Sequence, residues 1–120
     1  MSRFVPPGSY QKTATQINAN LYAKSERRDQ RWIASGANIT NLSGGLANLD
    51  GSLQAENDAA PSSGFVPNGS YKLTSESISV VLSAYCQKRD GSWQWATLDI
   101  TSYVAGHGDI ANIDGQLEIQ

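Results

Sequence analysis

The chain has 120 residues and a formal charge of −2, which suits one domain and is too short for two ordinary independent domains. Its nine Lys and Arg and eleven Asp and Glu are interspersed, so the sequence has no basic stripe of the kind that holds nucleic acid. No run approaches the roughly 18 apolar residues of a membrane-spanning helix. We therefore expect neither nucleic-acid binding nor membrane insertion.

Two single residues narrow the chemistry further. Cys86 is the only cysteine, which excludes an intrachain disulfide and a cysteine-based zinc cluster. His107 is the only histidine and lies among glycines, so it gives little support for a metal or acid–base site. We expect no metal and no cofactor. The segment 1–7 lacks the apolar core of a signal peptide, which predicts a cytoplasmic or non-classically secreted protein.

The sequence contains an internal repeat. Phe-Val-Pro-Pro-Gly-Ser-Tyr at 4–10 returns as Phe-Val-Pro-Asn-Gly-Ser-Tyr at 65–71, an offset of 61. The offset becomes 64 where Ala-Asn-Leu-Asp-Gly-Ser-Leu at 47–53 returns as Ala-Asn-Ile-Asp-Gly-Gln-Leu at 111–117. Within a single domain, 1–120, we assign repeat one to about 4–55, a linker to about 56–64 and repeat two to about 65–120. Each repeat is near the lower size limit for folding alone, so the copies are expected to complete each other.

In repeat one, apolar and polar residues alternate over 17–24, which is typical of a half-buried antiparallel strand. The inward positions would be Ile17, Ala19, Leu21 and Ala23. The Asp50-Gly51 dipeptide then divides two short apolar runs and predicts a hairpin. The following segment, 56–64, has the composition of a turn and is a hinge candidate.

Repeat two follows the same order, with a strand over 77–87 whose inward positions would be Ile78, Val80, Leu82, Ala84 and Cys86. Cys86 ends this row and is interpreted as a small core residue, not as a nucleophile. Asp90-Gly91 predicts the turn into the next strand, over 92–100, and Asp114-Gly115 predicts a closing hairpin.

These motifs resemble the cyanovirin-N homology family of lectins. Repeat two carries Leu-Ser-Ala at 82–84, Asp-Gly-Ser-Trp at 90–93 and the closing hairpin at 110–117, and the similarity covers nearly the whole chain outside the hinge. There are also departures. Many members have disulfide cysteines where this chain has Ala14, Ser25 and Ser75, and many insert a short turn that the stretch 17–21 lacks.

The resemblance implies an all-β fold, an elongated pseudo-symmetric pseudo-dimer in which the two repeats exchange their closing β-hairpins. It implies a lectin without catalytic activity that recognises mannose-type oligosaccharides or glycoproteins at up to two sites at opposite ends. A monomer is expected, with a domain-swapped dimer through 56–64 as the alternative. Sugar-binding site one would consist of Lys12, Thr13, Glu26, Arg28, Asn112 and Asp114. Sugar-binding site two would consist of Asn48, Asp50, Ser70, Thr74, Gln87, Lys88, Arg89 and Asp90.

The residue types fit sugar recognition, because sugar hydroxyls both donate and accept hydrogen bonds and so suit neighbouring carboxylate, amide and cationic groups. Each motif also has a purely structural interpretation, since Asp-Gly favours a tight turn without any ligand and turn charges are often only solvated. Asp50 and Asp114 occupy equivalent places in different repeats, so they do not indicate a glycosidase pair and we expect no enzyme. The alternative function is a protein-interaction module that keeps this scaffold without sugar affinity.

The two repeats differ in their tryptophans and in the turn that follows the first strand. Trp32 and Trp93 are equivalent and are expected to pack in the core or across strands, whereas Trp95 has no equivalent and is expected to be the more exposed. Gly91 lies in the turn of repeat two where repeat one has Gln30. We therefore expect site two to be the more similar to the family's sites.

Overall fold

The computed structural model describes residues 4–42, 44–56 and 64–120. Its regular structure consists of β-strands and two short 3₁₀ helices, which confirms the all-β prediction. The helices are η1 (Ser9–Lys12) and η2 (Ser70–Leu73). The strands are β1 (Ala14–Glu26), β2 (Trp32–Asn38), β3 (Gly45–Leu49), β4 (Ser52–Glu56), β5 (Ser75–Gln87), β6 (Trp93–Asp99), β7 (Ile110–Ile113) and β8 (Gln116–Ile119).

Most of the predicted hinge, 57–63, lies outside the described residues. In the part of the chain that is described, no helix is long and apolar enough to cross a membrane. The predicted hairpin turns are confirmed, since 50–51 joins β3 to β4 and 114–115 joins β7 to β8.

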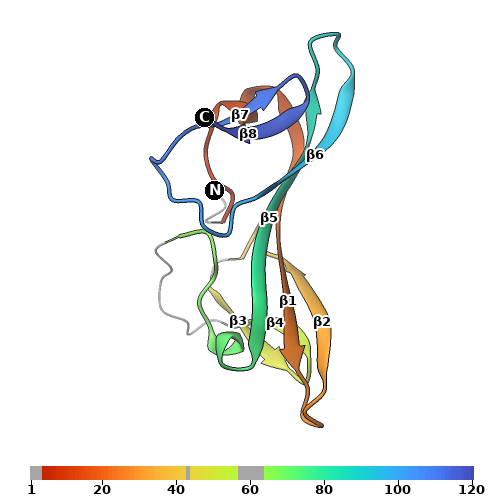
Figure 1. Ribbon diagram of the computed structural model, residues 1–120, viewed down its shortest axis with the longest axis vertical. Helices are drawn as coiled ribbons and strands as arrows, with labels where there is room; N and C mark the ends of the chain where they lie inside the picture. Colours follow the sequence, from red (N-terminus) through yellow and green to blue (C-terminus); the bar gives the residue numbers. More distant parts are fainter. Residues whose placement is uncertain (1–3, 43, 57–63) are drawn as a thin grey trace.

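The molecule is elongated because two long strands run along its length (Figure 1). Its extents are 52 × 25 × 20 Å and its radius of gyration is 15.3 Å, against about 14 Å for a compact chain of this length. A four-stranded antiparallel sheet in the order β2-β1-β5-β6 forms the spine, and the β3–β4 and β7–β8 hairpins form separate two-stranded sheets. Asn20 of β1 lies opposite Val81 of β5, and these residues are equivalent at the offset of 61.

Each end of the spine carries one hairpin and one 3₁₀ helix (Figure 1). β8 packs beside β6, and β4 packs beside β2, so each closing hairpin lies against a strand of its own repeat. The 3₁₀ helices do the opposite, because η1 packs on β7 and η2 packs on β3. The predicted exchange of closing hairpins is therefore corrected. The segments that cross to the other repeat are the N-terminal ones, which contain η1 and η2.

The course of β1 explains this correction. Over its 13 residues β1 contains no reversing turn, so it carries the chain roughly 40 Å from η1 to the opposite end. At Gln16, where φ is 52°, the strand has only a local irregularity, and the register to β5 shifts between Thr15 and Asn18. Ser77, the equivalent residue of β5, has a φ of 55°. Both long strands therefore bend without reversing, and each 3₁₀ helix is far from the turn of its own repeat.

The apolar rows predicted from the alternation lie in the core. The buried members on β1 and β5 are Ala19, Leu21, Ala23, Val80, Leu82, Ala84 and Cys86, while Ile17 and Ile78 pack against them partly buried. Burial raises the pKa of the Cys86 thiol. The interpretation of Cys86 as a core residue is confirmed.

The tryptophans lie on the outer face of the sheet. Trp32 and Trp93 are 44% and 50% exposed, so of the two predicted roles the core position is wrong. They lie at cross-strand positions, opposite Glu26 and Gln87. Ala96 of β6 is buried, and because side chains alternate along a strand, Trp93 and Trp95 must point outward. Trp95 is exposed as predicted, at 50%, but it is no more exposed than Trp93.

Candidate functional site

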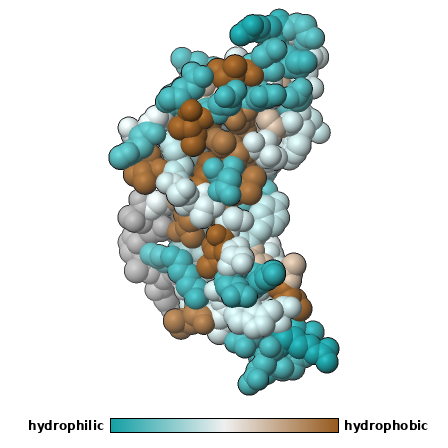
Figure 2. All heavy atoms as spheres, in the orientation of Figure 1, coloured by the Kyte–Doolittle hydropathy of each residue, from teal (hydrophilic) through white to brown (hydrophobic). Residues whose placement is uncertain are grey.

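Both ends of the molecule are rich in hydrophilic side chains (Figure 2), and at each end the closing hairpin turns beside the tip of the spine. The two turns use Asp-Gly pairs with positive φ at both residues, 53° and 90° at Asp50 and Gly51 and 49° and 91° at Asp114 and Gly115. This is the type I′ geometry that Asp-Gly favours. The asparagine two positions before each aspartate, Asn48 or Asn112, is thereby placed at the junction of the hairpin with the spine.

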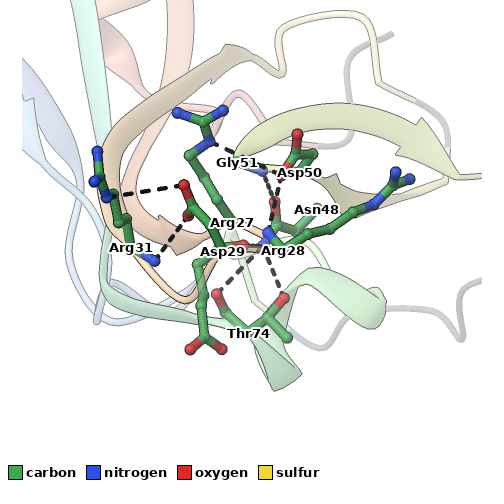
Figure 3. A network of polar contacts seen from close by, with 9 residues as sticks. Arg27, Arg28, Asp29, Arg31, Asn48, Asp50, Gly51 and Thr74 are labelled. Atoms are coloured by element: carbon green, nitrogen blue, oxygen red, sulfur yellow. Dashed lines mark hydrogen bonds and ion pairs between the residues drawn. The ribbon is translucent and has the colours of Figure 1, made fainter.

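We call the end that carries β3, β4 and η2 the lower end and the opposite end the upper end (Figure 1). At the lower end, the side chain of Asn48 bonds three separate segments (Figure 3). Its Nδ2 donates to the backbone oxygen of Glu26 and to Oγ1 of Thr74, both over 2.8 Å. Its Oδ1 accepts from the backbone N–H of Gly51 over 2.7 Å. The side chain therefore joins the closing hairpin to the end of β1 and to the residue that follows η2.

The charged groups of the lower end lie beside this junction (Figure 3). Asp50 Oδ1 accepts from the backbone N–H of Arg28 over 2.9 Å, and Nε of Arg27 lies 3.8 Å from the same oxygen. These groups border a hollow of about 220 Å³, which we call the lower pocket. It is lined by Glu26, Arg27, Arg28, Asn48, Leu49, Asp50 and Thr74.

The upper end repeats this arrangement with residues at the equivalent positions. Asn112 Nδ2 donates to the backbone oxygen of Gln87 and to Oγ1 of Thr13, both over 2.9 Å. The backbone N–H of Arg89 donates to Asp114 Oδ1 over 2.9 Å. The hollow here has a volume of about 280 Å³, and we call it the upper pocket. It is lined by Thr13, Gln87, Lys88, Arg89, Asn112, Ile113 and Asp114.

The predicted division of residues between two sites is therefore corrected. Thr13, Asn112 and Asp114 of site one lie together in the upper pocket, but Glu26 and Arg28 of that site line the lower pocket. Lys12, Thr13 and Glu26 can share a site only if the turn after β1 lies beside η1. Because β1 bends without reversing, this turn lies at the other end of the spine.

Site two is divided in the same way. Asn48, Asp50 and Thr74 lie together in the lower pocket. The remaining pocket residues of that site belong to the upper pocket and are Gln87, Lys88 and Arg89. Each pocket thus takes its threonine from one repeat and its turn and hairpin from the other.

Three predicted site residues lie outside the pocket linings, and two of them have structural partners. Ser70 donates its backbone N–H and its hydroxyl to the Glu56 carboxylate, over 3.0 and 2.9 Å. Asp90 accepts from the hydroxyl and the backbone N–H of Ser92, and these bonds lower the pKa of Asp90. Lys12 is exposed at the end of η1. Ser70 and Asp90 therefore have structural partners, and Lys12 lies at the surface beside the upper pocket's N-terminal segment.

Arg27, Leu49 and Ile113 also line the pockets and were not predicted. The repeat itself contained the signal, because Arg27 is equivalent to the predicted Lys88, and Leu49 and Ile113 occupy equivalent places inside the two Asn-x-Asp motifs. A residue-by-residue comparison of the two copies would have found Arg27, and the position of Leu49 and Ile113 between two predicted site residues would have pointed to the other two.

Several pocket side chains are available to a ligand. Among the described residues, the Glu26 carboxylate and the guanidinium groups of Arg28 and Arg89 make neither a hydrogen bond nor an ion pair within the protein. The same is true of the Lys88 ammonium group. The described residues contain no cluster of three His, Cys, Asp or Glu side chains suited to a metal ion. The pockets thus offer carboxylate, amide, hydroxyl and cationic groups.

No family model matches this sequence, and a comparison with curated proteins also finds no match. The function is therefore inferred from the geometry and chemistry of the two pockets.

Proposed function

We propose that the protein is a lectin of the cyanovirin-N homology type that binds mannose-type oligosaccharides, free or on glycoproteins, in its upper and lower pockets. The observation that carries the proposal is the presence of the same polar arrangement at both ends. In each pocket a hairpin aspartate accepts from the backbone of a turn arginine over 2.9 Å. A tight turn alone does not require this bond between the aspartate and the arginine backbone, and yet the bond is present at both ends.

The chemistry of this arrangement suits vicinal sugar hydroxyls. The Asp50 and Asp114 carboxylates are held in place by the backbone, so their remaining acceptor capacity is preorganised for a hydroxyl donor. The arginine side chains supply several donors in a planar group. The volumes of about 220 and 280 Å³ fall below the range of about 300–1,000 Å³ typical of drug-sized ligands. This size suits the terminal one or two residues of a sugar chain.

The absence of catalysis is part of the proposal. Glu26 and Asp50 both line the lower pocket, but the upper pocket has Gln87 in the place of Glu26. An amide cannot serve as the acid or base of a carboxylate pair. Because only one of the two equivalent pockets contains such a pair, the repeated arrangement is better explained by binding than by hydrolysis.

The pseudo-dimer is likewise a proposal. The pairing of Asn20 with Val81 places equivalent residues opposite each other, as happens at the two-fold axis of an isologous interface. The matching bends at Gln16 and Ser77 and the matching pockets support the same axis. We infer two equivalent halves, each completed by the N-terminal segment of the other repeat.

The experiment is an NMR titration of the full chain with an α-linked mannose disaccharide, followed by backbone amide shifts. We expect perturbation of 26–28, 48–50 and Thr74 at one end, and of Thr13, 87–89 and 112–114 at the other. Arg28→Ala and Arg89→Ala should each weaken binding only at their own end, by about 1.5–3 kcal/mol if the guanidinium bonds the sugar.

Arg31→Ala is the matched control, because Arg31 lies in the same turn as Arg28 but outside the pocket lining. The proposal fails if neither the disaccharide nor longer mannose oligosaccharides perturb either pocket. That result would favour the protein-interaction module.

A further inference from the structure

An exposed aromatic cluster lies on the outer face of the sheet in the upper half. Tyr85, Trp93 and Trp95 are 38%, 50% and 50% exposed. Tyr85 of β5 lies opposite Trp95 of β6 in the ladder, and their ring centroids are 4.9 Å apart in an edge-to-face arrangement at 66°. We call these three residues the aromatic ledge. The three residues are positioned by the β5–β6 ladder, Tyr85 and Trp95 also contact each other, and all three rings present substantial surface to solvent.

One residue, Gln87, relates the aromatic ledge to the upper pocket. Gln87 lines that pocket, and in the ladder the same residue lies directly opposite Trp93. Directly opposed residues share a face of the sheet, with Cβ atoms roughly 4.5–5.5 Å apart. A ligand chain that leaves the upper pocket past Gln87 therefore meets Trp93 and then Trp95.

The side chains around the aromatic ledge are neutral and polar. Thr15 of β1 is the other ladder neighbour of Tyr85, and Thr97 is the next outward residue of β6. Both threonines are exposed. Aromatic rings carry a negative face that attracts C–H groups, and the flat face of a sugar ring presents such groups. Hydroxyls beside exposed aromatic rings suit an uncharged, hydroxyl-rich ligand better than an ionic one.

The lower half keeps Trp32, the equivalent of Trp93, and has an exposed Tyr22, but among the described residues it lacks a ring pair like that of Tyr85 with Trp95. Lys24 occupies the position equivalent to Tyr85, and Ala34 occupies the position equivalent to Trp95. Lys24 and Ala34 face each other across the β1–β2 ladder and are exposed. The two ends therefore share their pockets but differ in the surface next to them.

We propose that the aromatic ledge is an extended carbohydrate subsite of the upper pocket, on which the sugar residues beyond the first two of a neutral oligosaccharide stack. This inference rests on the proposed lectin function and adds a difference in ligand length between the ends. Trp93 and Trp95 are two positions apart on one strand, hence roughly 6.6–6.8 Å apart and on the same face. The upper pocket takes longer chains, and the lower pocket takes short ones.

The residues of the lower half define a matched variant for the test. In Tyr85→Lys/Trp95→Ala, the ring pair of the aromatic ledge is replaced by the residues at the equivalent positions of the lower half. Trp93, whose equivalent is Trp32, and every residue lining the upper pocket are kept. Linear α-linked mannose di- and tetrasaccharides are titrated into the full chain, and the upper and lower pockets are followed separately by their backbone amide shifts.

For the unchanged protein we expect the upper pocket to bind the tetrasaccharide roughly two- to tenfold more tightly than the disaccharide, the range of a single aromatic contact. The lower pocket should show no such gain. The double variant should lose the gain and keep its affinity for the disaccharide. Trp95→Phe should keep part of the gain and Trp32→Ala should leave it intact, so that loss of an exposed tryptophan is separated from loss of this one.

Equal affinity of the upper pocket for both oligosaccharides would overturn the inference, and so would a gain that survives in the double variant. Sedimentation is run in parallel, because a concentration-dependent dimer abolished by the double variant would show that the ledge binds a second copy of the chain. Disaccharide binding without length dependence overturns only the ledge. Failure of both oligosaccharides at both pockets overturns the lectin proposal as well.

Discussion

Asn112 donates from Nδ2 to Oγ1 of Thr13 over 2.9 Å, although the two residues are 99 positions apart in the sequence. The same amide group donates to the backbone of Gln87, and its oxygen accepts from Gly115. One side chain thus joins the N-terminal segment, the end of β5 and the closing turn. Asn48 does the same at the other end with Thr74, Glu26 and Gly51.

Alanine at either asparagine should destabilise the protein. We expect Asn48→Ala to lower the free energy of unfolding by roughly 2–3 kcal/mol, because the backbone groups it bonds would lose partners at a partly buried site. Asn112→Ala should cost less, since its bonds lie at an exposed site. Urea unfolding followed by circular dichroism measures both. A loss below about 0.5 kcal/mol for Asn48→Ala would show that the junction does not stabilise the fold.

Gly69 cannot accept a side chain. Its φ is 145°, and an added Cβ would lie 2.0 Å from the backbone oxygen of Leu46, where η2 meets β3. Gly69→Ala should therefore cost more than roughly 2 kcal/mol of unfolding free energy, from backbone strain and from separation of the two segments. Thermal and urea unfolding measure the loss. Gly64→Ala is the control, because nothing lies within 4 Å of a Cβ at that position.

Replacing Gln30 by glycine should increase the stability of the protein. It has a φ of 69°, at the position where the equivalent turn has Gly91 with a φ of 89°. A non-glycine residue in this conformation is strained by about 1–2 kcal/mol, and glycine removes the strain at some cost in chain entropy. We expect Gln30→Gly to raise the free energy of unfolding by roughly 0.5–1 kcal/mol.

Gly91→Ala tests the same link between a left-handed backbone and stability in the opposite direction, because it places a non-glycine residue at a positive φ. Nothing lies within 4 Å of a Cβ added at Gly91, so any loss of stability reports the backbone conformation alone. If Gly91→Ala is neutral, left-handed φ values at these turns carry no strain, and the gain expected for Gln30→Gly should vanish too.

Asp109 should make the upper half sensitive to acid. The hydroxyl and the backbone N–H of Ser9 donate to its carboxylate, and these bonds hold the pKa of Asp109 below its usual value. Because the pKa is lower in the folded state, the bonds stabilise the fold above the ordinary aspartate pKa of about 4 and are lost as the pH falls through the folded value. Asp109→Asn should therefore flatten the decline of stability on acidification.

Ser9→Ala removes both the hydroxyl donor and the principal cause of the lowered pKa, so it should flatten the same acid limb. The midpoint of unfolding is measured at pH values between 2 and 7, in steps on the order of one pH unit. Its dependence on pH is then compared between the unchanged protein and the two variants. Parallel curves for the unchanged protein and both variants would assign the acid sensitivity to other carboxylates.

The strands and turns followed from local chemistry. Alternation placed Leu21 and Leu82 in the core, and the two Asp-Gly pairs marked the hairpins, because side-chain direction and turn type depend on neighbouring residues alone. The path of the long strands did not follow in this way. Alternation over 17–24 is equally compatible with a strand that reverses and with one that continues, and the bend at Gln16 has no glycine or proline to mark it.

The composition of the pockets depended on that path. Thr13 and Glu26 were assigned to one site, yet they lie at opposite ends of β1. A strand that does not reverse keeps these two residues apart, whereas a turn within it would have brought them together. The exposure of Trp32 and Trp93 was not predicted, because their equivalence in the repeat suggested a shared packing role, in the core or across strands. On β6 the burial of Ala96 shows that Trp93 and Trp95 point outward, since side chains alternate along a strand.

The pairing of Asn20 with Val81 also sets an order of folding. The β1–β2 and β5–β6 hairpins close over five-residue turns, whereas the central β1–β5 pairing joins residues 61 positions apart. Loop-closure entropy rises with separation, so pairing over long separations is slow. The two hairpins are therefore expected to form early and independently, and the rate of folding is then governed by their meeting along β1 and β5.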